Sequence, residues 1–449
     1  ENYLNDAKIA ISNIYTNETI QLPYTQSHTG GQPRYSYDGE SIAFRTNVPA
    51  SRIAPALNHN AAINNQICVA HLHNKSVACF ENTPNENPTI LGWHPNNKSV
   101  YVEDTFQTSG HQIYLLTRDK KAELISKPSD GVLENSQLNA SGTQLGFALE
   151  RLDKPVEVYV SQTTLFDPKQ ISKLQTSMPS ALPSSSVINW KSTDGTNIQG
   201  ILLLPPNYNP AKKYPLIVGI HGGPEGVWAQ RYIGSCEGGG TMTIPPCWGV
   251  MATKGFIILL PNPRGSTGYG RSFRTANFAD WGGRDYEDIM SGVDMLIRKQ
   301  VADANHLGVA GWSYGGYMTN WIATQTNQFK VAVDGASMSN LISFFKSTDL
   351  INEAEEYFGV SYEKDPSLYR ARSPITHIEQ VKTPILIVHG DDDTRVPFTQ
   401  GTEWQKALLS KHKMVKLHMM PKQAHIPTDP SETISAIHAI EDWLEKVKY

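Results

Sequence analysis

Features that are scarce in this 449-residue sequence exclude several classes of protein. The longest apolar stretches, near Phe256 and Ile385, are far too short to cross a membrane as a helix. The formal net charge is only −4 and no basic run is present, so nucleic acid has no electrostatic site to bind. Hydrophobic residues make up 39% of the chain, which suffices for two buried cores. These limits indicate a soluble two-domain protein.

Cysteine is also scarce, and the positions of the four residues are informative. Cys68 and Cys79 flank a predicted hairpin turn at 73–75 almost symmetrically, so they face each other across two strands. Cys236 and Cys247 bracket a glycine-rich loop. Local pairing in both cases predicts two disulfides and therefore a periplasmic or secreted protein. Buried free thiols are the alternative.

Glycine, by contrast, is concentrated around one serine. Residues 311–315 (GWSYG) directly follow the apolar stretch 307–310, which predicts a strand, a sharp turn and a helix with Ser313 at the apex. In such a nucleophile elbow the serine backbone is strained, and the glycines on both sides let neighbouring elements approach. A strand–helix turn without catalytic function is the alternative.

A serine nucleophile needs an imidazole base and a carboxylate that orients it. Residues 384–390 (PILIVHG) form a buried-strand pattern that runs into Asp391, Asp392 and Asp393. The next strand pattern, at 415–421, is followed by His425. This order of serine, aspartate and histidine is that of α/β-hydrolases. Spacing alone does not choose among the three aspartates.

Three other histidines compete with His425 for the role of base. His412 and His418 come before or within the last strand pattern, and His438 lies in an amphipathic helical pattern. A base has to follow that strand to reach the serine, so the sequence favours His425.

An oxyanion hole is predicted upstream. Residues 214–220 (YPLIVGI) form a central-strand pattern that ends in HGGP at 221–224. The α/β-hydrolase arrangement places a loop with backbone donors at this point. We expect one N–H from Gly223 and one from Tyr314, the residue after the nucleophile. A Gly-Pro turn without this function is the alternative.

Together these motifs resemble the prolyl oligopeptidase family of serine peptidases, nearest its acylaminoacyl-peptidase branch. The resemblance rests on GWSYGGYM, HGDDDTRVP, HGGP, NPRGSTGYG and the late histidine, and covers roughly residues 185–449. It implies that Asp393 is the catalytic acid and that Arg395 binds a substrate backbone carbonyl. A structural salt bridge is the alternative for Arg395. Residues 423–427 (QAHIP) depart from the Gly-His-Gly-type loop that is usual around the base.

The two halves of the chain predict different folds. Apolar strand patterns alternate with helical ones in residues 181–449, which predicts an α/β-hydrolase domain with a doubly wound, mostly parallel sheet. Residues 1–180 contain short strand patterns and a weak repeat at 33–44, 92–101 and 138–147. That period suggests blades of a β-propeller, with a β-sandwich as the alternative. A proline- and serine-rich linker is predicted at 179–186.

Members of the family carry a seven-bladed propeller before the hydrolase, and residues 1–180 have room for only about half of one. The sequence also has no initiator methionine and no signal peptide, so we expect that Glu1 is not the translated start. Under this hypothesis the remaining blades either form a separate associated chain or were removed.

The sequence therefore predicts a serine peptidase that cleaves short peptides through an acyl-enzyme intermediate, of the oligopeptidase, dipeptidyl- or acylaminoacyl-peptidase type. No metal or organic cofactor is needed for this chemistry. One alternative is a carboxylesterase, because the same triad cleaves esters. The other is a catalytically silent protein that binds through its propeller. The expected partners are a peptide substrate and the chain that carries the missing blades, and a homo-oligomer stays open.

Overall fold

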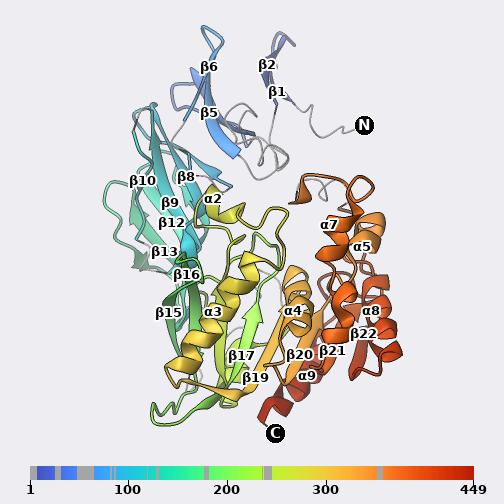
Figure 1. Ribbon diagram of the computed structural model, residues 1–449. Helices are drawn as coiled ribbons and strands as arrows, with labels where there is room; N and C mark the ends of the chain where they lie inside the picture. The colour runs from blue at the N-terminus through green and yellow to red at the C-terminus, as the bar shows by residue number, and fades with distance from the viewer. Residues whose placement is uncertain are drawn as a thin grey trace. The chain divides into compact units, whose positions relative to one another are not determined.

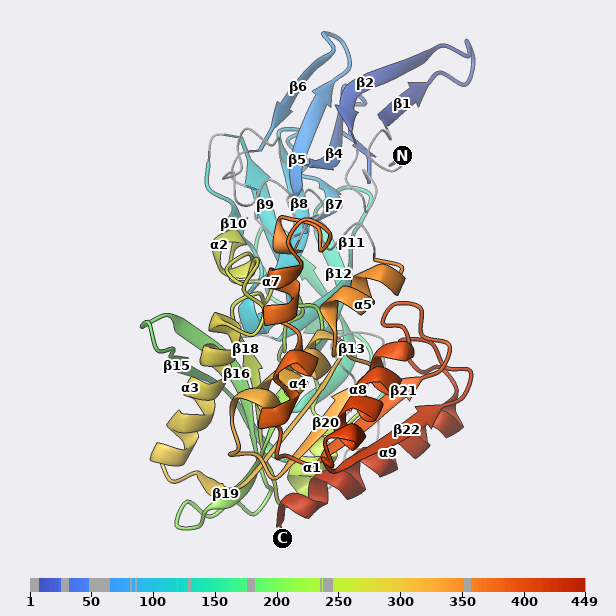
Figure 2. The ribbon, with the colours of Figure 1, turned by 45° about the vertical axis from the view of Figure 1, so that its right-hand side comes forward.

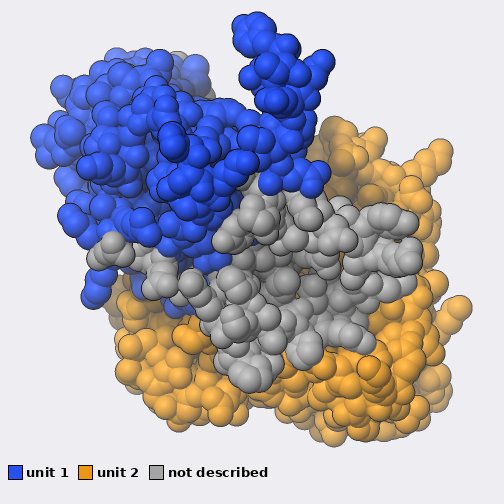
Figure 3. Space-filling model, turned by 90° about the horizontal axis from the view of Figure 1, so that it is seen from above, with its two compact units in different colours: residues 1–177, 267–271 blue, residues 178–266, 272–449 orange. Residues whose placement is uncertain are grey.

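The computed structural model describes residues 8–25, 32–47, 65–80, 83–84, 87–118, 120–127, 131–175, 182–234, 236, 245–350 and 357–448. The chain divides into two compact units, coloured separately in Figure 3. Unit 1 contains residues 1–177 and 267–271, and unit 2 contains residues 178–266 and 272–449. The predicted domain boundary at 180/181 and the first part of the predicted linker, 179–181, lie outside the described residues.

Unit 1 is built from small antiparallel sheets. The first is a hairpin of β1 (Lys8–Ser12) and β2 (Thr19–Thr25). Three four-stranded sheets follow, each made of strands that are consecutive in the chain. They contain β3 (Arg34–Tyr35), β4 (Ser41–Asn47), β5 (Asn65–His71) and β6 (Ser76–Cys79); β7 (Thr89–Trp93), β8 (Ser99–Thr105), β9 (His111–Thr117) and β10 (Glu123–Leu124); and β11 (Val132–Leu138), β12 (Gln144–Arg151), β13 (Lys154–Gln162) and β14 (Lys169–Gln170).

Consecutive sheets of unit 1 bury their faces against each other. Ile67 of the first four-stranded sheet shares a hydrophobic cluster with Val100 of the second. Ile113 of the second shares another cluster with Leu145 and Phe147 of the third. A small sheet cannot bury both faces by itself, so this stacking is what propeller blades require. The propeller itself stays a prediction.

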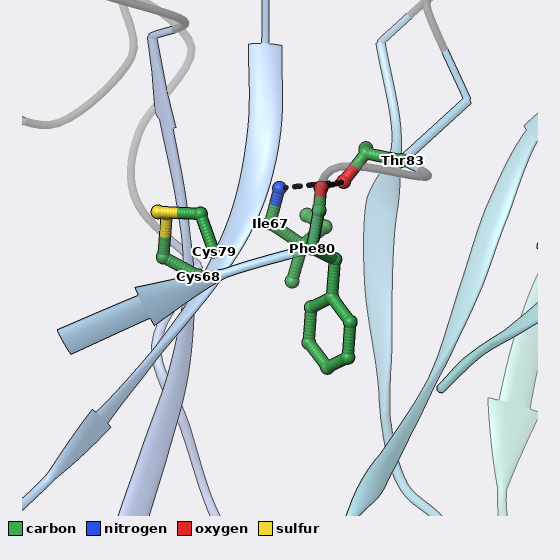
Figure 4. Close-up of a disulfide and its surroundings, with 5 residues drawn as sticks. All are labelled: Ile67, Cys68, Cys79, Phe80 and Thr83. Atoms are coloured by element: carbon green, nitrogen blue, oxygen red, sulfur yellow. Dashed lines mark hydrogen bonds between the residues drawn. A yellow bond between two sulfur atoms is a disulfide. The ribbon is translucent and has the colours of Figure 1, made fainter. Parts of the chain in front are cut away.

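The predicted disulfide in unit 1 joins β5 to β6. Cys68 and Cys79 are directly opposite in the antiparallel register and are bonded to each other, as Figure 4 shows. Beside the disulfide, Thr83 accepts the Ile67 N–H at 3.2 Å and donates its hydroxyl to the Phe80 carbonyl at 2.7 Å. These bonds fasten the chain that leaves β6 to the neighbouring strand.

Unit 2 is built on an eight-stranded sheet in the order β15-β16-β18-β17-β19-β20-β21-β22 (Figure 1). The strands are β15 (Ser184–Lys191), β16 (Asn197–Leu204), β17 (Tyr214–Ile220), β18 (Ile257–Asn262), β19 (Ala302–Trp312), β20 (Val331–Gly335), β21 (Ile385–Gly390) and β22 (Val415–Met420). Pairing is antiparallel from β15 to β18 and parallel from β18 to β22. The predicted hydrolase fold with a mostly parallel sheet is confirmed.

Helices cover both faces of this sheet; α8 and α9 can be followed on either side of β22 in Figure 2. Alternate strand residues such as Val309 and Ile387 pack with Val293 of α3 and Trp404 of α8 in the largest hydrophobic cluster. No helix in the described ranges is both long and apolar enough to span a bilayer. The helices are α1 (Trp248–Thr253), α2 (Arg271–Arg274), α3 (Arg284–Arg298), α4 (Tyr314–Gln325), α5 (Leu341–Ser347), α7 (Pro366–Ala371), α8 (Thr399–Ser410) and α9 (Pro430–Glu445).

Candidate active site

Ser313 lies at a strained turn between β19 and α4. Its backbone has φ 59° and ψ −123°, a conformation that costs energy for a non-glycine residue. The glycines two positions away are required sterically, because a Cβ at Gly311 would lie 2.3 Å from the Gly315 carbonyl oxygen, and a Cβ at Gly315 would lie 2.1 Å from that of Ile220. The Ser313 N–H donates to the Gly335 carbonyl at 2.8 Å, which fixes the turn on the sheet. The predicted strand, turn and helix are confirmed.

Asp393 and His425 are hydrogen-bonded to each other in the loops that follow β21 and β22. The distance from His425 Nδ1 to Asp393 Oδ2 is 2.8 Å. Burial alone would raise the pKa of the Asp393 carboxyl, but hydrogen bonds from His389 and His425 outweigh it and lower that pKa to about 2. The carboxylate is therefore ionised and can only accept, so His425 carries its hydrogen on Nδ1. Nε2 of His425 is left free to accept a proton.

The structure separates Asp393 from the other two aspartates of the run. The Asp393 side chain is fully buried, whereas Asp391 and Asp392 are exposed. Asp391 accepts the backbone N–H of Lys422, which ties the loop after β21 to the turn after β22. Only the third aspartate is thus placed to orient an imidazole among these described residues.

Of the four candidate histidines, His425 is the one that reaches the pocket beside Ser313 in the part of the chain that the structure describes. His418 lies within β22 and His438 within α9. His412 follows α8 in a left-handed backbone conformation, with φ 56°. The preference for the histidine after the last strand therefore agrees with the geometry.

A cavity of about 550 Å³ brings the predicted site residues together. It is lined by His221, Gly222, Gly223, Gly226, Val227, Trp312, Ser313, Asp349, Thr394, Arg395, Ala424, His425 and Ile426. Tyr314, the second predicted oxyanion donor, begins α4 directly after Ser313. Ser313, His425 and the loop at 221–224, called the glycine loop below, therefore face one space that a substrate can enter.

The glycine loop is anchored by polar contacts that its sequence did not reveal. The buried His221 ring lies with Nε2 2.9 Å from Ser266 Oγ and with Nδ1 2.8 Å from the Gly222 carbonyl oxygen. Burial lowers the pKa of His221 to about 4, so the ring is neutral at neutral pH. Trp228, in the segment that follows the loop, exchanges two hydrogen bonds of 2.7 and 3.0 Å with Asn262 at the end of β18. The loop is therefore held in place before any substrate arrives.

Arg395 forms an ion pair with Asp349 at the edge of the cavity. The distance from Arg395 Nε to Asp349 Oδ1 is 2.8 Å, and the two side chains are 48% and 44% exposed. Exposed pairs of this kind contribute little to stability, typically about 0–1 kcal/mol. This bond uses Nε, so the N–H groups on the two Nη atoms of Arg395 can donate to a ligand. Both hypotheses for Arg395 are therefore compatible with this geometry.

Comparison with known proteins places part of this chain among serine peptidases. Residues 248–448 match the sequence profile of the prolyl oligopeptidase family. This segment belongs to the prolyl oligopeptidase family. The chain is 35% identical over 269 residues to the uncharacterized peptidase YuxL of Bacillus subtilis, covering 58% of this chain and 38% of that protein. It is 30% identical over 239 residues to the human acylamino-acid-releasing enzyme, covering 51% of this chain and 31% of that protein.

The fold is likewise similar to solved structures of peptidases. The acylaminoacyl peptidase of Pyrococcus horikoshii superposes with a TM-score of 0.75 at 22% identity, covering 99% of this chain and 65% of that chain. The chain spans about a third to two fifths of the length of the curated relatives it matches. At this identity the structural similarity shows the fold alone. The family resemblance expected from the motifs is confirmed.

Behind the nucleophile, Tyr314 and Asp285 form a buried contact that sequence analysis missed. The Tyr314 hydroxyl donates to the Asp285 carboxylate, and Asn277 Nδ2 lies 3.4 Å from the same hydroxyl. Burial raises the pKa of Asp285 to about 7. This contact holds the first turn of α4 in place, and with it the Tyr314 N–H that is expected to face the oxyanion. Asp285 sits in the first turn of α3, where an acidic residue has an ordinary structural explanation, so the sequence alone gave no signal.

Proposed function

We propose that this chain carries the catalytic site of a serine peptidase that acts on short peptides, with Ser313, His425 and Asp393 as its triad. The observation that carries this proposal is the hydrogen bond from His425 to a buried, ionised Asp393 beside a serine on a nucleophile elbow. An ionised partner fixes the tautomer in which the second imidazole nitrogen is a base.

The proposed reaction proceeds in two steps. Ser313 Oγ attacks the peptide carbonyl carbon while His425 Nε2 takes the hydroxyl proton, and the backbone N–H groups of Gly223 and Tyr314 stabilise the oxyanion. The C–N bond then breaks as His425 returns the proton to the leaving amine. Water, activated by the same histidine, hydrolyses the ester on Ser313 and restores the enzyme.

Several observations support short peptides as the substrate class. The cavity of about 550 Å³ has room for a few residues beside Ser313. Arg395 lines it and offers donors to a second backbone carbonyl. Relatives of the same family include a protein named dipeptidyl-peptidase 5 from Aspergillus fumigatus, 30% identical over 258 residues, as well as the acylamino-acid-releasing enzyme.

The proposal extends to unit 1 and to the compartment. The stacked four-stranded sheets support part of a β-propeller in residues 1–180, next to a hydrolase domain in residues 181–449. Both cysteine pairs are disulfide-bonded, which supports a periplasmic or secreted protein.

The test compares wild type, Ser313→Ala and Ser410→Ala, the last an exposed serine at the end of α8. Labelling with a fluorophosphonate probe detects the reactive serine. Cleavage of a peptide library and of a small activated ester shows whether the enzyme releases amines, alcohols or both. We expect Ser313→Ala to lose labelling and to lower peptide turnover by about a thousandfold or more. The Ser410→Ala variant should match wild type. Equal labelling of Ser313→Ala would remove the proposed nucleophile, and labelled wild type that cleaves only the ester would favour a carboxylesterase.

A further inference from the structure

A second histidine, His389, is buried against the catalytic carboxylate. It occupies the end of β21 and is 0% exposed. Its Nε2 lies 2.8 Å from the Val396 carbonyl oxygen. Because a carbonyl oxygen can only accept, Nε2 carries a hydrogen. The same nitrogen lies 3.5 Å from Oδ2 of Asp393, so the N–H that donates to the carbonyl also lies beside the carboxylate, whose pKa it helps to lower.

Protein donors surround Asp393 on both oxygens. Oδ1 accepts the Val396 N–H at 2.8 Å. Oδ2 accepts the Nδ1–H of His425 at 2.8 Å and faces Nε2 of His389. Two imidazoles therefore lie at the same oxygen, and one of them is the proposed base.

The far side of the His389 ring is enclosed. Its Nδ1 is buried and has no hydrogen-bond partner in the described ranges, and the same holds for Oδ1 of Asp334. Asp334 pairs with Ile387 in the parallel register of β20 and β21, so Asp334 and His389 share one face of the sheet. Within the described ranges, Asp334 and Asp393 are the acidic groups that interact electrostatically with His389. The Asn320 side chain already donates to Asp334 Oδ2 at 2.7 Å.

Two residues near α8 define the space for the ring. The Phe398 ring meets His389 edge-on, with centroids 5.6 Å apart. Gly401 lies over Nδ1, and a Cβ there would come within 2.8 Å of that nitrogen. The imidazole has no room to turn away, so its Nε2–H stays directed at Val396 and Asp393.

We propose that His389 is a positioning residue of the active site. Its Nε2–H holds the Asp393 carboxylate in the orientation that His425 needs, and it stabilises part of the negative charge on Oδ2. This inference rests on the proposed role of Asp393 and His425. It assigns to the histidine of the HGDDD segment a task that is separate from the packing of β21.

Removal of this donor has a predictable direction. Without this donor, the negative charge on Oδ2 stabilises protonated His425 more strongly than in wild type. His425 in the variant therefore loses its proton at a higher pH than in wild type. The acidic limb of the rate profile, which reports loss of that proton from the free enzyme, then moves to higher pH. The rate on the plateau falls as well, because the carboxylate loses one of the groups that fix its orientation.

The test measures fluorophosphonate labelling of Ser313 as a function of pH in wild type, His389→Gln and His389→Met. Glutamine places an N–H donor close to the position of Nε2, whereas methionine fills a similar volume without a donor. We expect His389→Met to label about ten- to a hundredfold more slowly. Its acidic limb should move up by about half a pH unit to one unit. His389→Gln should stay within about threefold of wild type.

If His389→Met labels at the wild-type rate with an unmoved acidic limb, the proposal is overturned. Equal impairment of His389→Met and His389→Gln also overturns it, because a residue that acts only through packing would not need an N–H donor. If His389→Met does not fold, His389→Leu, a second variant without a donor, takes its place; an unmoved acidic limb in that folded variant overturns the proposal. The probe needs no peptide. Wild type that fails to label or to cleave peptides therefore refutes the proposed function, whereas labelled wild type with unchanged variants refutes only the role of His389.

Discussion

Replacement of Asp393 by asparagine tests the proposed catalytic carboxylate with almost no change in shape. The buried side chain accepts the Val396 N–H on Oδ1 and the His425 Nδ1–H on Oδ2, and Nε2 of His389 lies 3.5 Å from Oδ2. An amide has a single acceptor oxygen, so one of these positions must receive an NH₂ group. If the NH₂ faces His425, that ring has to move its hydrogen to Nε2 and is no longer a base. If the NH₂ faces Val396, two donors meet at 2.8 Å.

The magnitude follows from the bonds that are lost. Two hydrogen bonds to a charged group are weakened, each worth about 1.5–3 kcal/mol. A barrier higher by about 5.5 kcal/mol corresponds to a loss of about four orders of magnitude in kcat, which is the size of the tautomer effect in serine proteases. Steady-state peptide cleavage and probe labelling, both at neutral pH, measure it. Thermal unfolding verifies that the variant is folded.

Asp391→Asn is the matched control, because this carboxylate is exposed and two positions away. We expect its kcat/KM to stay within about twofold of wild type. If Asp391→Asn loses activity while Asp393→Asn keeps more than a tenth of the wild-type rate, the assignment within the aspartate run is wrong.

Three further predictions concern other contacts. Arg395→Ala should lower kcat/KM for a peptide about ten- to a hundredfold while sparing a small activated ester; equal losses on both substrates, or the same loss in Asp349→Ala, would instead favour the salt bridge. Burial raises the pKa of Asp285 from its ordinary 3.8 to about 7, so this group stabilises the fold below pH 4 and its contribution disappears as the pH rises to 7. Urea unfolding should therefore show Asp285→Asn gaining stability relative to wild type across that interval, and a constant difference would contradict the raised pKa. Thiol counting in denaturant without reductant should find no free thiol, and Cys236→Ser should destabilise unit 2 by about 3 kcal/mol; a full set of four reactive thiols would remove the argument for an oxidising compartment.

The parts of the site that sequence could predict are those specified by neighbouring residues. The elbow around Ser313 needs small residues on both sides, and the structure shows the carbonyl oxygens that exclude a Cβ there. The position of His425 follows from the chain order of strands, because the carboxyl ends of parallel strands lie at one edge of the sheet. The two disulfides were predictable because each pair is local in the chain.

The remainder depends on contacts between distant segments. Asp391 and Asp393 are chemically identical in the sequence, and only the burial of one of them separates them. The packing of His389 against Asp393 and the alignment with Asp334 arise from strand register, which a single sequence does not reveal. Likewise, Asp349 is 46 residues from Arg395, and no local pattern connects them.

The strained turn at Ser313 also makes this serine, the proposed nucleophile, a reporter of folding. Its left-handed backbone is held by a hydrogen bond to Gly335 of β20 and by the close approach of Ile220 of β17 to Gly315. Neither partner is near Ser313 in the chain, so the turn cannot persist in a partly assembled sheet. Probe labelling therefore counts molecules whose central strands are correctly assembled, and during refolding it should appear only together with the native core.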